Sequence, residues 1–203
     1  MGLSSDFSSD LIVVDDFLSK NDLKELQELM ASVSSSKQVL YSPSVVLGDD
    51  MFNPKEKETH NFQMCHDFKE LNTLWILEKF FYERVGILFL ERAKANLTFW
   101  TDRIVEHGLH VDLGDLGFER GEVIKCNLSH VPIKTACFYL NTCDGYTVFE
   151  NGEKIQSVEN RYVEFDRTLK HSGTTTTDAA FRSVINLNYV PTNLFPRIKH
   201  YRY

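Results

Sequence analysis

The chain has 203 residues, of which 42% are hydrophobic and 25% are charged, and its formal net charge at pH 7 is -7. This length fits one domain with a real core, and the composition is typical of a soluble globular protein. Binding along a nucleic-acid backbone needs clustered Lys and Arg, so the acidic balance argues against duplex nucleic acid as a partner. No stretch approaches the roughly 20 apolar residues of a membrane helix, so no membrane partner is expected.

The cysteines and the N-terminus bear on the compartment. The four cysteines form no Cys-x-x-Cys pair and show no zinc-finger spacing, which favours small buried side chains in a reducing environment. They are Cys65, Cys126, Cys137 and Cys143. The first residues carry acids where a secretory signal carries bases, and we therefore predict a cytoplasmic protein.

The first third of the chain is predicted to hold a short strand and supporting helices. The apolar run 11–14 is typical of a strand, and Ser19 with Asp22 forms a capping box that opens a helix. One face of that helix carries Leu23, Leu26 and Leu29. Residues 36–62 contain two prolines and many polar side chains and are predicted to form a long surface loop. From 68 to 95 the apolar residues recur at helical spacing, which predicts one long helix or a broken pair.

After residue 96 the pattern changes to short strands separated by tight turns. The dipeptides Asp144-Gly145 and Asn151-Gly152 are typical of hairpin turns. The predicted strands cover 97–100, 123–127, 133–140, 146–149, 161–165 and 182–190.

Helices followed by many short strands indicate an α+β fold. The architecture that fits best is a double-stranded β-helix, a jelly-roll or cupin-type barrel, braced by N-terminal helices. We expect a single domain over 1–203, with the N-terminal strand and supporting helices in 1–95 and the jelly-roll core in 96–195.

The tripeptide His110-Val111-Asp112 carries the strongest chemical signal. In a strand, residues i and i+2 point to the same face, so this imidazole and this carboxylate could meet one metal ion. His171, in a later strand-rich segment, is a third candidate ligand. Two histidines and one carboxylate on one side of a metal are the ligands of non-haem Fe(II) oxygenases, although zinc accepts the same ligands.

Arg182 lies eleven residues beyond His171, near the start of an apolar strand. Strand alternation puts Arg182, Val184, Asn186 and Asn188 on one face and Ser183, Ile185, Leu187 and Tyr189 on the other. A guanidinium directed into a barrel needs an anionic partner, because an unpaired buried charge is costly. A dicarboxylate cosubstrate supplies that partner through bidentate pairing. The alternative is a structural carboxylate such as Glu164 or Asp166.

These residues belong to a longer pattern. Residues 135–150 read Thr-Ala-Cys-Phe-Tyr-Leu-Asn-Thr-Cys-Asp-Gly-Tyr-Thr-Val-Phe-Glu, followed by Val-Glu-Phe-Asp at 163–166 and Lys-His-Ser-Gly-Thr at 170–174. With the His-x-Asp tripeptide before them and Arg182 after them, they resemble the core of the prolyl 4-hydroxylase-like 2-oxoglutarate/Fe(II) oxygenases. The resemblance covers residues 96–190, and the helical N-terminal third agrees in kind but not by motif.

The resemblance implies roles for individual residues. The iron ligands would be His110, Asp112 and His171. Arg182 would pair with the distal carboxylate of 2-oxoglutarate, and Tyr139 matches a tyrosine that often hydrogen-bonds the same carboxylate, with a core aromatic as the alternative. Asn186 and Asn188 face the same way as Arg182 and would either help to hold the cosubstrate or satisfy backbone groups.

Two departures from the family pattern bear on the substrate. Some relatives place Ser or Thr two residues after the arginine, where this chain has Val184. The stretch 113–132 is unusually long and glycine-containing, and it is predicted to form a mobile loop near the mouth of the barrel.

The resemblance implies an Fe(II)/2-oxoglutarate-dependent dioxygenase that hydroxylates a C–H bond and forms succinate and carbon dioxide, with ascorbate as a candidate reductant. The substrate, a small molecule or a peptide, stays open. Peptidyl proline is the family's natural candidate, but no residue pattern here recognises proline. Two other classes remain: a metal-dependent hydrolase with the same ligands, and a non-catalytic cupin-like binding module.

Overall fold

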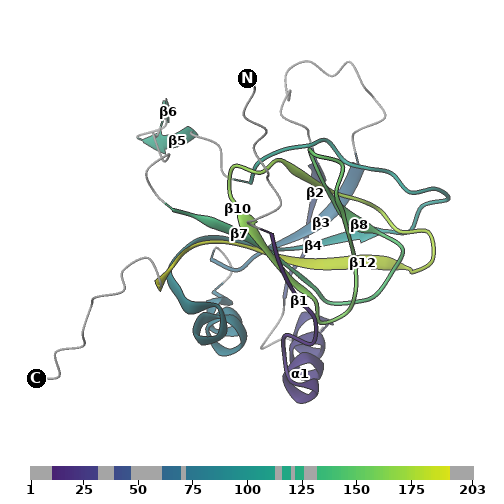
Figure 1. Cartoon of the computed structure of the whole chain (residues 1–203), viewed down its shortest axis with the longest axis horizontal. Coiled ribbons are helices and arrows are strands. Elements are labelled where there is room, and N and C mark those ends of the chain that lie inside the picture. The colour runs from purple at the N-terminus through teal and green to yellow at the C-terminus, as the bar shows by residue number, and fades with distance from the viewer. Residues whose placement is uncertain are drawn as a thin grey trace, which may run out of the picture.

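The structure is a computed structural model, and it describes residues 11–31, 39–46, 61–69, 72–112, 116–119, 122–125 and 132–192. A large antiparallel sheet forms its centre (Figure 1). In sheet order its strands are β1 (Ile12–Val14), β10 (Tyr162–Asp166), β7 (Lys134–Tyr139), β12 (Phe181–Pro191), β4 (Ile87–Phe99), β3 (Asn61–Asp67) and β2 (Ser42–Val46).

A smaller sheet packs over one face of the large sheet. Its strands, in sheet order, are β11 (His171–Gly173), β8 (Tyr146–Phe149) and β9 (Lys154–Gln156). Phe149 of this sheet packs edge-on against Phe165 of the large sheet, with ring centroids 5.0 Å apart. A separate hairpin pairs β5 (Leu116–Glu119) with β6 (Glu122–Lys125).

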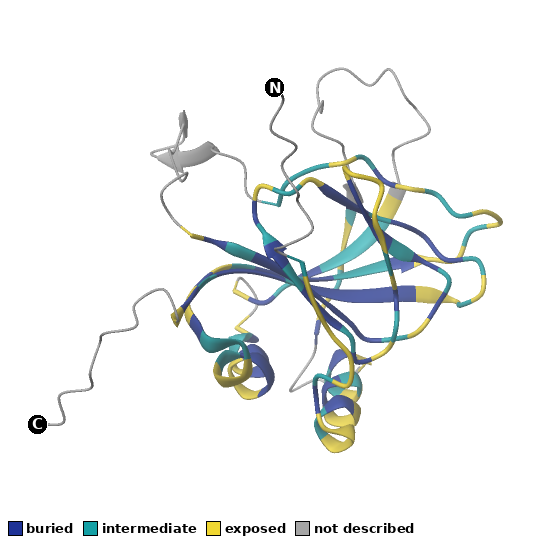
Figure 2. Ribbon diagram, in the orientation of Figure 1, coloured by how far each residue is buried: buried dark blue, intermediate teal, exposed yellow. Residues whose placement is uncertain are grey.

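The helices cover the opposite face of the large sheet (Figures 1 and 2). They are α1 (Lys20–Ala31), and α2 (Leu74–Leu77), which continues into a π-helix, η2 (Glu78–Gly86). Ser19 caps α1 as predicted, because its hydroxyl oxygen accepts the backbone N–H of Asp22 at 3.2 Å. Leu23 and Leu26 are buried against the sheet, which confirms the predicted apolar stripe of this helix.

Strand β12 shows how one sequence serves both faces of the large sheet. Ile185, Leu187 and Tyr189 point into the main core, which the helices cover. Arg182 and Val184 point the other way, toward the small sheet. The predicted alternation of this strand is therefore confirmed, and it separates an apolar layer from a polar one.

The prediction of helix up to residue 95 is wrong, because residues 87–99 form β4. The pairing of β4 with β12 skips Glu91 and Leu88, and each of these extra residues makes a bulge that shifts the alternation. Buried positions consequently fall at Ile87, Leu90 and Ala93, three residues apart, which imitates the spacing of a helix.

Two further predictions are corrected by the sheets. The predicted loop 36–62 contains β2 and the first residues of β3, whereas residues 47–60 lie outside the described part. Asp144-Gly145 is not a hairpin turn, because it connects β7 of the large sheet to β8 of the small one. Gly145 is needed there for close approach: a Cβ would lie 2.6 Å from the backbone oxygen of Thr175.

The other turn and strand predictions agree with the structure. Asn151-Gly152 joins β8 to β9 as a hairpin, with Gly152 at φ 84°. Strands were found at each predicted segment after residue 96, and β4 also spans the expected boundary at 95/96. Cys137 and Cys143 are buried and Cys65 is half-buried, while Cys126 lies outside the described residues.

Much of the predicted loop 113–132 also lies outside the described residues, which include the β5–β6 hairpin and residue 132. Among the helices that the structure describes, none is long and apolar enough to cross a membrane.

Phe138→Ala should lower the free energy of unfolding by about 3–5 kcal/mol, because it removes a fully buried ring that contacts Phe17 and Phe81. Urea unfolding followed by circular dichroism measures the change. Phe89→Ala is the matched control: Phe89 is 56% exposed, so its loss should cost less than about 1 kcal/mol. Equal losses in the two variants would contradict the assignment of the core.

Candidate metal centre

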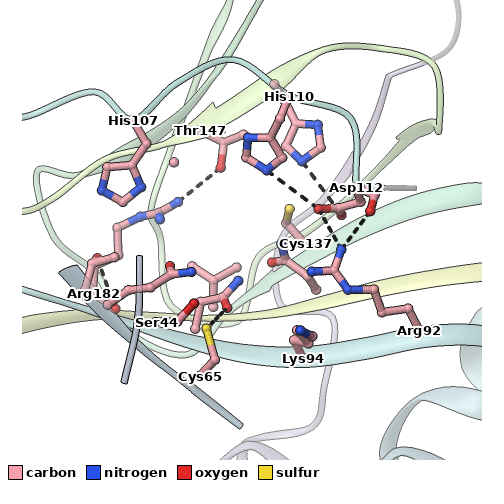
Figure 3. Close-up of a pocket in the computed structure, with 17 residues that line it drawn as sticks. Ser44, Cys65, Arg92, Lys94, His107, His110, Asp112, Cys137, Thr147 and Arg182 are labelled. Atoms are coloured by element: carbon pink, nitrogen blue, oxygen red, sulfur yellow. Dashed lines mark hydrogen bonds and ion pairs between the residues drawn. The ribbon is translucent and has the colours of Figure 1, made fainter. Parts of the chain in front are cut away.

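Two histidines and one carboxylate meet in the pocket between the two sheets (Figure 3). Potential ligand atoms of His110, Asp112 and His171 all lie within 4.8 Å of one another. Nε2 of His110 is 3.7 Å from Oδ1 of Asp112, and Nε2 of His171 is 3.8 Å from Oδ2. The structure thus brings together the three residues that the sequence singled out as metal ligands.

Backbone pairing brings the two histidines together. The amide of each donates to the carbonyl oxygen of the other at 3.0 Å, so His110 forms an isolated bridge to β11. The expectation that His110 and Asp112 share one face assumed a strand, but the described segment 101–112 contains isolated bridges alone. Strand alternation therefore does not align His110 with Asp112.

The imidazoles are held with Nε2 toward Asp112. Nδ1 of His110 lies 2.9 Å from the carbonyl oxygen of Gly108, and Nδ1 of His171 lies 3.2 Å from that of Leu169. Nε2 of His171 is buried and has no hydrogen-bond partner among the described residues. Burial lowers the pKa of His171, against the opposite effect of Asp112, and this favours the neutral imidazole that a metal requires.

Asp112 is held by residues from the two central strands. Arg92 of β4 donates through Nη1 to the backbone oxygen of Asp112 at 2.9 Å and to Oδ1 at 3.3 Å. Asn188 of β12 donates to Oδ2 at 3.3 Å. Burial would raise the pKa of Asp112, but the nearby imidazoles and the Arg92 guanidinium outweigh it and hold that pKa below its ordinary value. Asp112 is therefore a charged candidate ligand whose carboxylate is held in one position.

Arg182 lies in the same pocket with 5% of its surface exposed. Its Nη2 donates to the hydroxyl of Thr147 at 3.0 Å, and its guanidinium lies over the ring of Tyr139, 5.3 Å from the centroid. Its Nε has no partner, and it forms no ion pair with a carboxylate of the described residues. The alternative of a structural carboxylate fails, because Glu164 accepts from Tyr162 and Tyr189 and Asp166 accepts from Thr168.

The three residues predicted to assist Arg182 occupy different positions. Asn186 lines the pocket. Asn188 is bonded to Asp112 and to Thr135, so it lies on the metal side. Tyr139 is fully buried beneath the pocket, where its hydroxyl donates to Thr147 at 2.8 Å.

His107, three residues before His110 and not predicted to be a metal ligand, also lines the pocket. It is 6% exposed, and its Nε2 is buried with no hydrogen-bond partner in the described structure. Burial, together with the charge of Arg182, lowers the pKa of His107 to about 4, so the ring is neutral at physiological pH. Gly173 gives both side chains room, because a Cβ there would lie 3.3 Å from Nη1 of Arg182.

Three pocket residues were missed. Thr147 stands in the Thr-x-Phe part of the family-like pattern but had no assigned role. Arg92 and Lys94 fall in the segment predicted as helix, where no barrel-facing direction could be given to them. Their signal was the alternation of polar residues at 92, 94, 96 and 98, all of which line the pocket.

Comparison with known proteins gives matches at the level of structure. Neither a family model nor a curated protein matches this sequence. A 2OG-Fe(II) oxygenase family oxidoreductase from Burkholderia pseudomallei aligns with a TM-score of 0.56 and 12% identity, over 89% of this chain and 85% of its own.

Two further solved structures are equally similar. A Trichoplax adhaerens prolyl hydroxylase, in complex with a hypoxia inducible factor oxygen degradation domain peptide fragment, has a TM-score of 0.56 and 13% identity, over 91% of this chain and 84% of its own. SnoN, a non-heme alpha ketoglutarate dependent epimerase from nogalamycin biosynthesis, has a TM-score of 0.56 and 13% identity, over 91% of this chain and 78% of its own.

At this level of identity the matches establish the architecture. They confirm the predicted double-stranded β-helix with helices packed on its outer face. The chain therefore has the fold of the 2-oxoglutarate/Fe(II) oxygenases, the family that its sequence motifs resemble.

Proposed function

We propose that this protein is an Fe(II)- and 2-oxoglutarate-dependent dioxygenase that hydroxylates a C–H bond and forms succinate and carbon dioxide. One observation carries the proposal: a single pocket contains the His-Asp-His group and a buried arginine without a carboxylate partner in the described residues. Such a pocket is suited to bind a metal ion through the His-Asp-His group and an acid through the arginine.

His110, Asp112 and His171 would hold the iron. The neutral imidazoles and the ionised carboxylate are a suitable donor set, and the buried, unpartnered Nε2 of His171 points to a ligand at this position. Bound iron(II) supplies open coordination positions for the cosubstrate and dioxygen, and the redox chemistry of the reaction. The protein orients these donors beforehand through Arg92 and Asn188.

Arg182 would bind the far carboxylate of 2-oxoglutarate. The Thr147 hydroxyl accepts from both Arg182 and Tyr139, and this network fixes the guanidinium in one orientation. We assign Tyr139 to this positioning role. His107 adds a neutral ring nitrogen beside Arg182, as a second contact for the same carboxylate.

The two asparagines divide between the two functions. Asn186 remains a candidate cosubstrate contact, because it lines the pocket. Asn188 is engaged with Asp112, so we assign it to the metal site instead of the cosubstrate.

The alternative functions account for fewer of these contacts. A metal-dependent hydrolase would use the same three ligands, but its reaction does not require a buried arginine that binds an acidic cosubstrate. A non-catalytic binding module requires neither an ionised Asp112 nor two imidazoles directed at it. The similar structures include a prolyl hydroxylase and an epimerase, so the fold leaves the substrate open, with peptidyl proline among the candidates.

Anaerobic titration of the metal-free protein with Fe(II) and 2-oxoglutarate should produce a visible metal-to-ligand charge-transfer band. His171→Ala should abolish the band, because it removes one of the three candidate ligands, a buried imidazole. Circular dichroism of the variant controls for folding. The oxygenase proposal would be wrong if the band survives in a folded His171→Ala protein. It would also be wrong if the protein loaded with zinc alone acts as a hydrolase.

Arg182→Gln should weaken 2-oxoglutarate binding by about 30-fold or more, because it removes one partner of a desolvated charge pair. His107→Gln should weaken it by roughly tenfold, through the loss of one hydrogen bond to a charged group. Isothermal titration calorimetry of the zinc-loaded protein measures both affinities without turnover.

Lys24→Ala, an exposed cation on α1, is the control for these titrations and should leave the affinity unchanged. Wild-type affinity in Arg182→Gln would contradict the assignment of the acid-binding residue.

A further inference from the structure

The pocket continues past the candidate metal ligands along the inner face of β2, β3 and β4. Its floor there consists of Ser44, Gln63, Cys65, Lys94 and Asn96. Among the described residues that line the pocket there is no Phe, Tyr or Trp, and Val184 is the sole aliphatic side chain. Most small-molecule pockets are lined mainly by apolar and aromatic side chains, so this one is suited to a strongly polar substrate.

The charges in the pocket do not balance. Arg92, Lys94 and Arg182 are cations, and Asp112 is the one carboxylate among the described lining residues. An iron(II) ion and a 2-oxoglutarate dianion would cancel each other, so both would leave the excess of positive charge unchanged. This excess of positive charge lies inside a chain of net charge -7, and it favours the binding of a further anion.

Lys94 is the cation still available to that anion. Arg92 is engaged by Asp112, and Arg182 would be engaged by the cosubstrate. The ammonium group of Lys94 lies 3.9 Å from Oδ2 of Asp67, at the outer limit of an ion pair, and its side chain is 32% exposed. Such a loose, partly hydrated ion pair contributes little to stability. A substrate oxyanion can therefore bind the Lys94 ammonium with little loss of free energy.

We propose that the primary substrate is a small, strongly polar acid, whose carboxylate or phosphate pairs with Lys94 while polar groups of Gln63 and Asn96 contact its remainder. The inference rests on the proposed function and names the substrate class of the same pocket. Lys94 follows Arg92 by two residues on one strand face, about 7 Å along β4. Lys94 therefore lies in the same pocket as the candidate metal ligands, next to the arginine that binds Asp112.

The test uses the 203-residue chain loaded with Fe(II) and saturating 2-oxoglutarate under anaerobic conditions. Two acids, glycerol 3-phosphate and 3-hydroxybutanoate, are titrated against their neutral counterparts, glycerol and 1,3-butanediol. Calorimetry gives the affinities, and the charge-transfer band reports whether the iron site is formed. Saturation with 2-oxoglutarate prevents the acids from binding at Arg182.

At least one acid should bind with a heat that its neutral counterpart does not produce. Lys94→Ala should weaken this binding by roughly tenfold, the loss of one charge-assisted hydrogen bond, and Lys94→Arg should retain it. Lys24→Ala changes the net charge equally but far from the pocket, and it should bind as the wild type does.

Two results overturn the inference if the charge-transfer band is normal: the acids bind no better than the alcohols, or they bind Lys94→Ala as well as the wild type. Either result leaves the proposed function standing. Absence of the band in every protein overturns the proposed function instead. In that case the same titration of the metal-free protein still decides whether Lys94 forms an oxyanion site.

Discussion

The carboxylate of Asp112 lies inside the pocket with 3% of its side chain exposed, so water cannot stabilise its charge and the protein must do so. Arg92 and Asn188 supply donors from neighbouring strands, β4 and β12, and two imidazoles turn their Nε2 atoms toward it. The position of the Asp112 carboxylate therefore depends on the pairing of the two central strands and on the bridge between His110 and β11.

Arg182 places the same demand on the opposite part of the pocket. A buried guanidinium is stable when its N–H groups have hydrogen-bond partners and its charge is compensated. The Thr147 hydroxyl and the ring of Tyr139 meet part of this requirement. The unpartnered nitrogen atoms of Arg182 and His107 are the part left for an acid. The fold thus keeps opposite charges apart in one pocket, each ready for a ligand of complementary charge.

Strand β4 connects this chemistry to the architecture. Its two bulges let its N-terminal half bury Ile87 and Leu90 against the helices, while its second half alternates in phase and directs Arg92 and Lys94 into the pocket. The spacing of the buried residues imitated a helix, because the bulges at Leu88 and Glu91 interrupt the alternation and can be seen only in the pairing with β12. The error in the predicted structure of this segment also concealed both cations.

The sequence by itself determined the class of fold, the alternation of β12, the three candidate metal ligands and Arg182, because these follow from local periodicity and a family-like order of motifs. The tertiary structure decided that backbone pairing, instead of a shared strand, brings His110 and His171 together, and that Arg92 fixes Asp112. It also decided that His107 lies beside Arg182. Each of these contacts joins two residues that are far apart in the sequence, so no local pattern of residues could specify them.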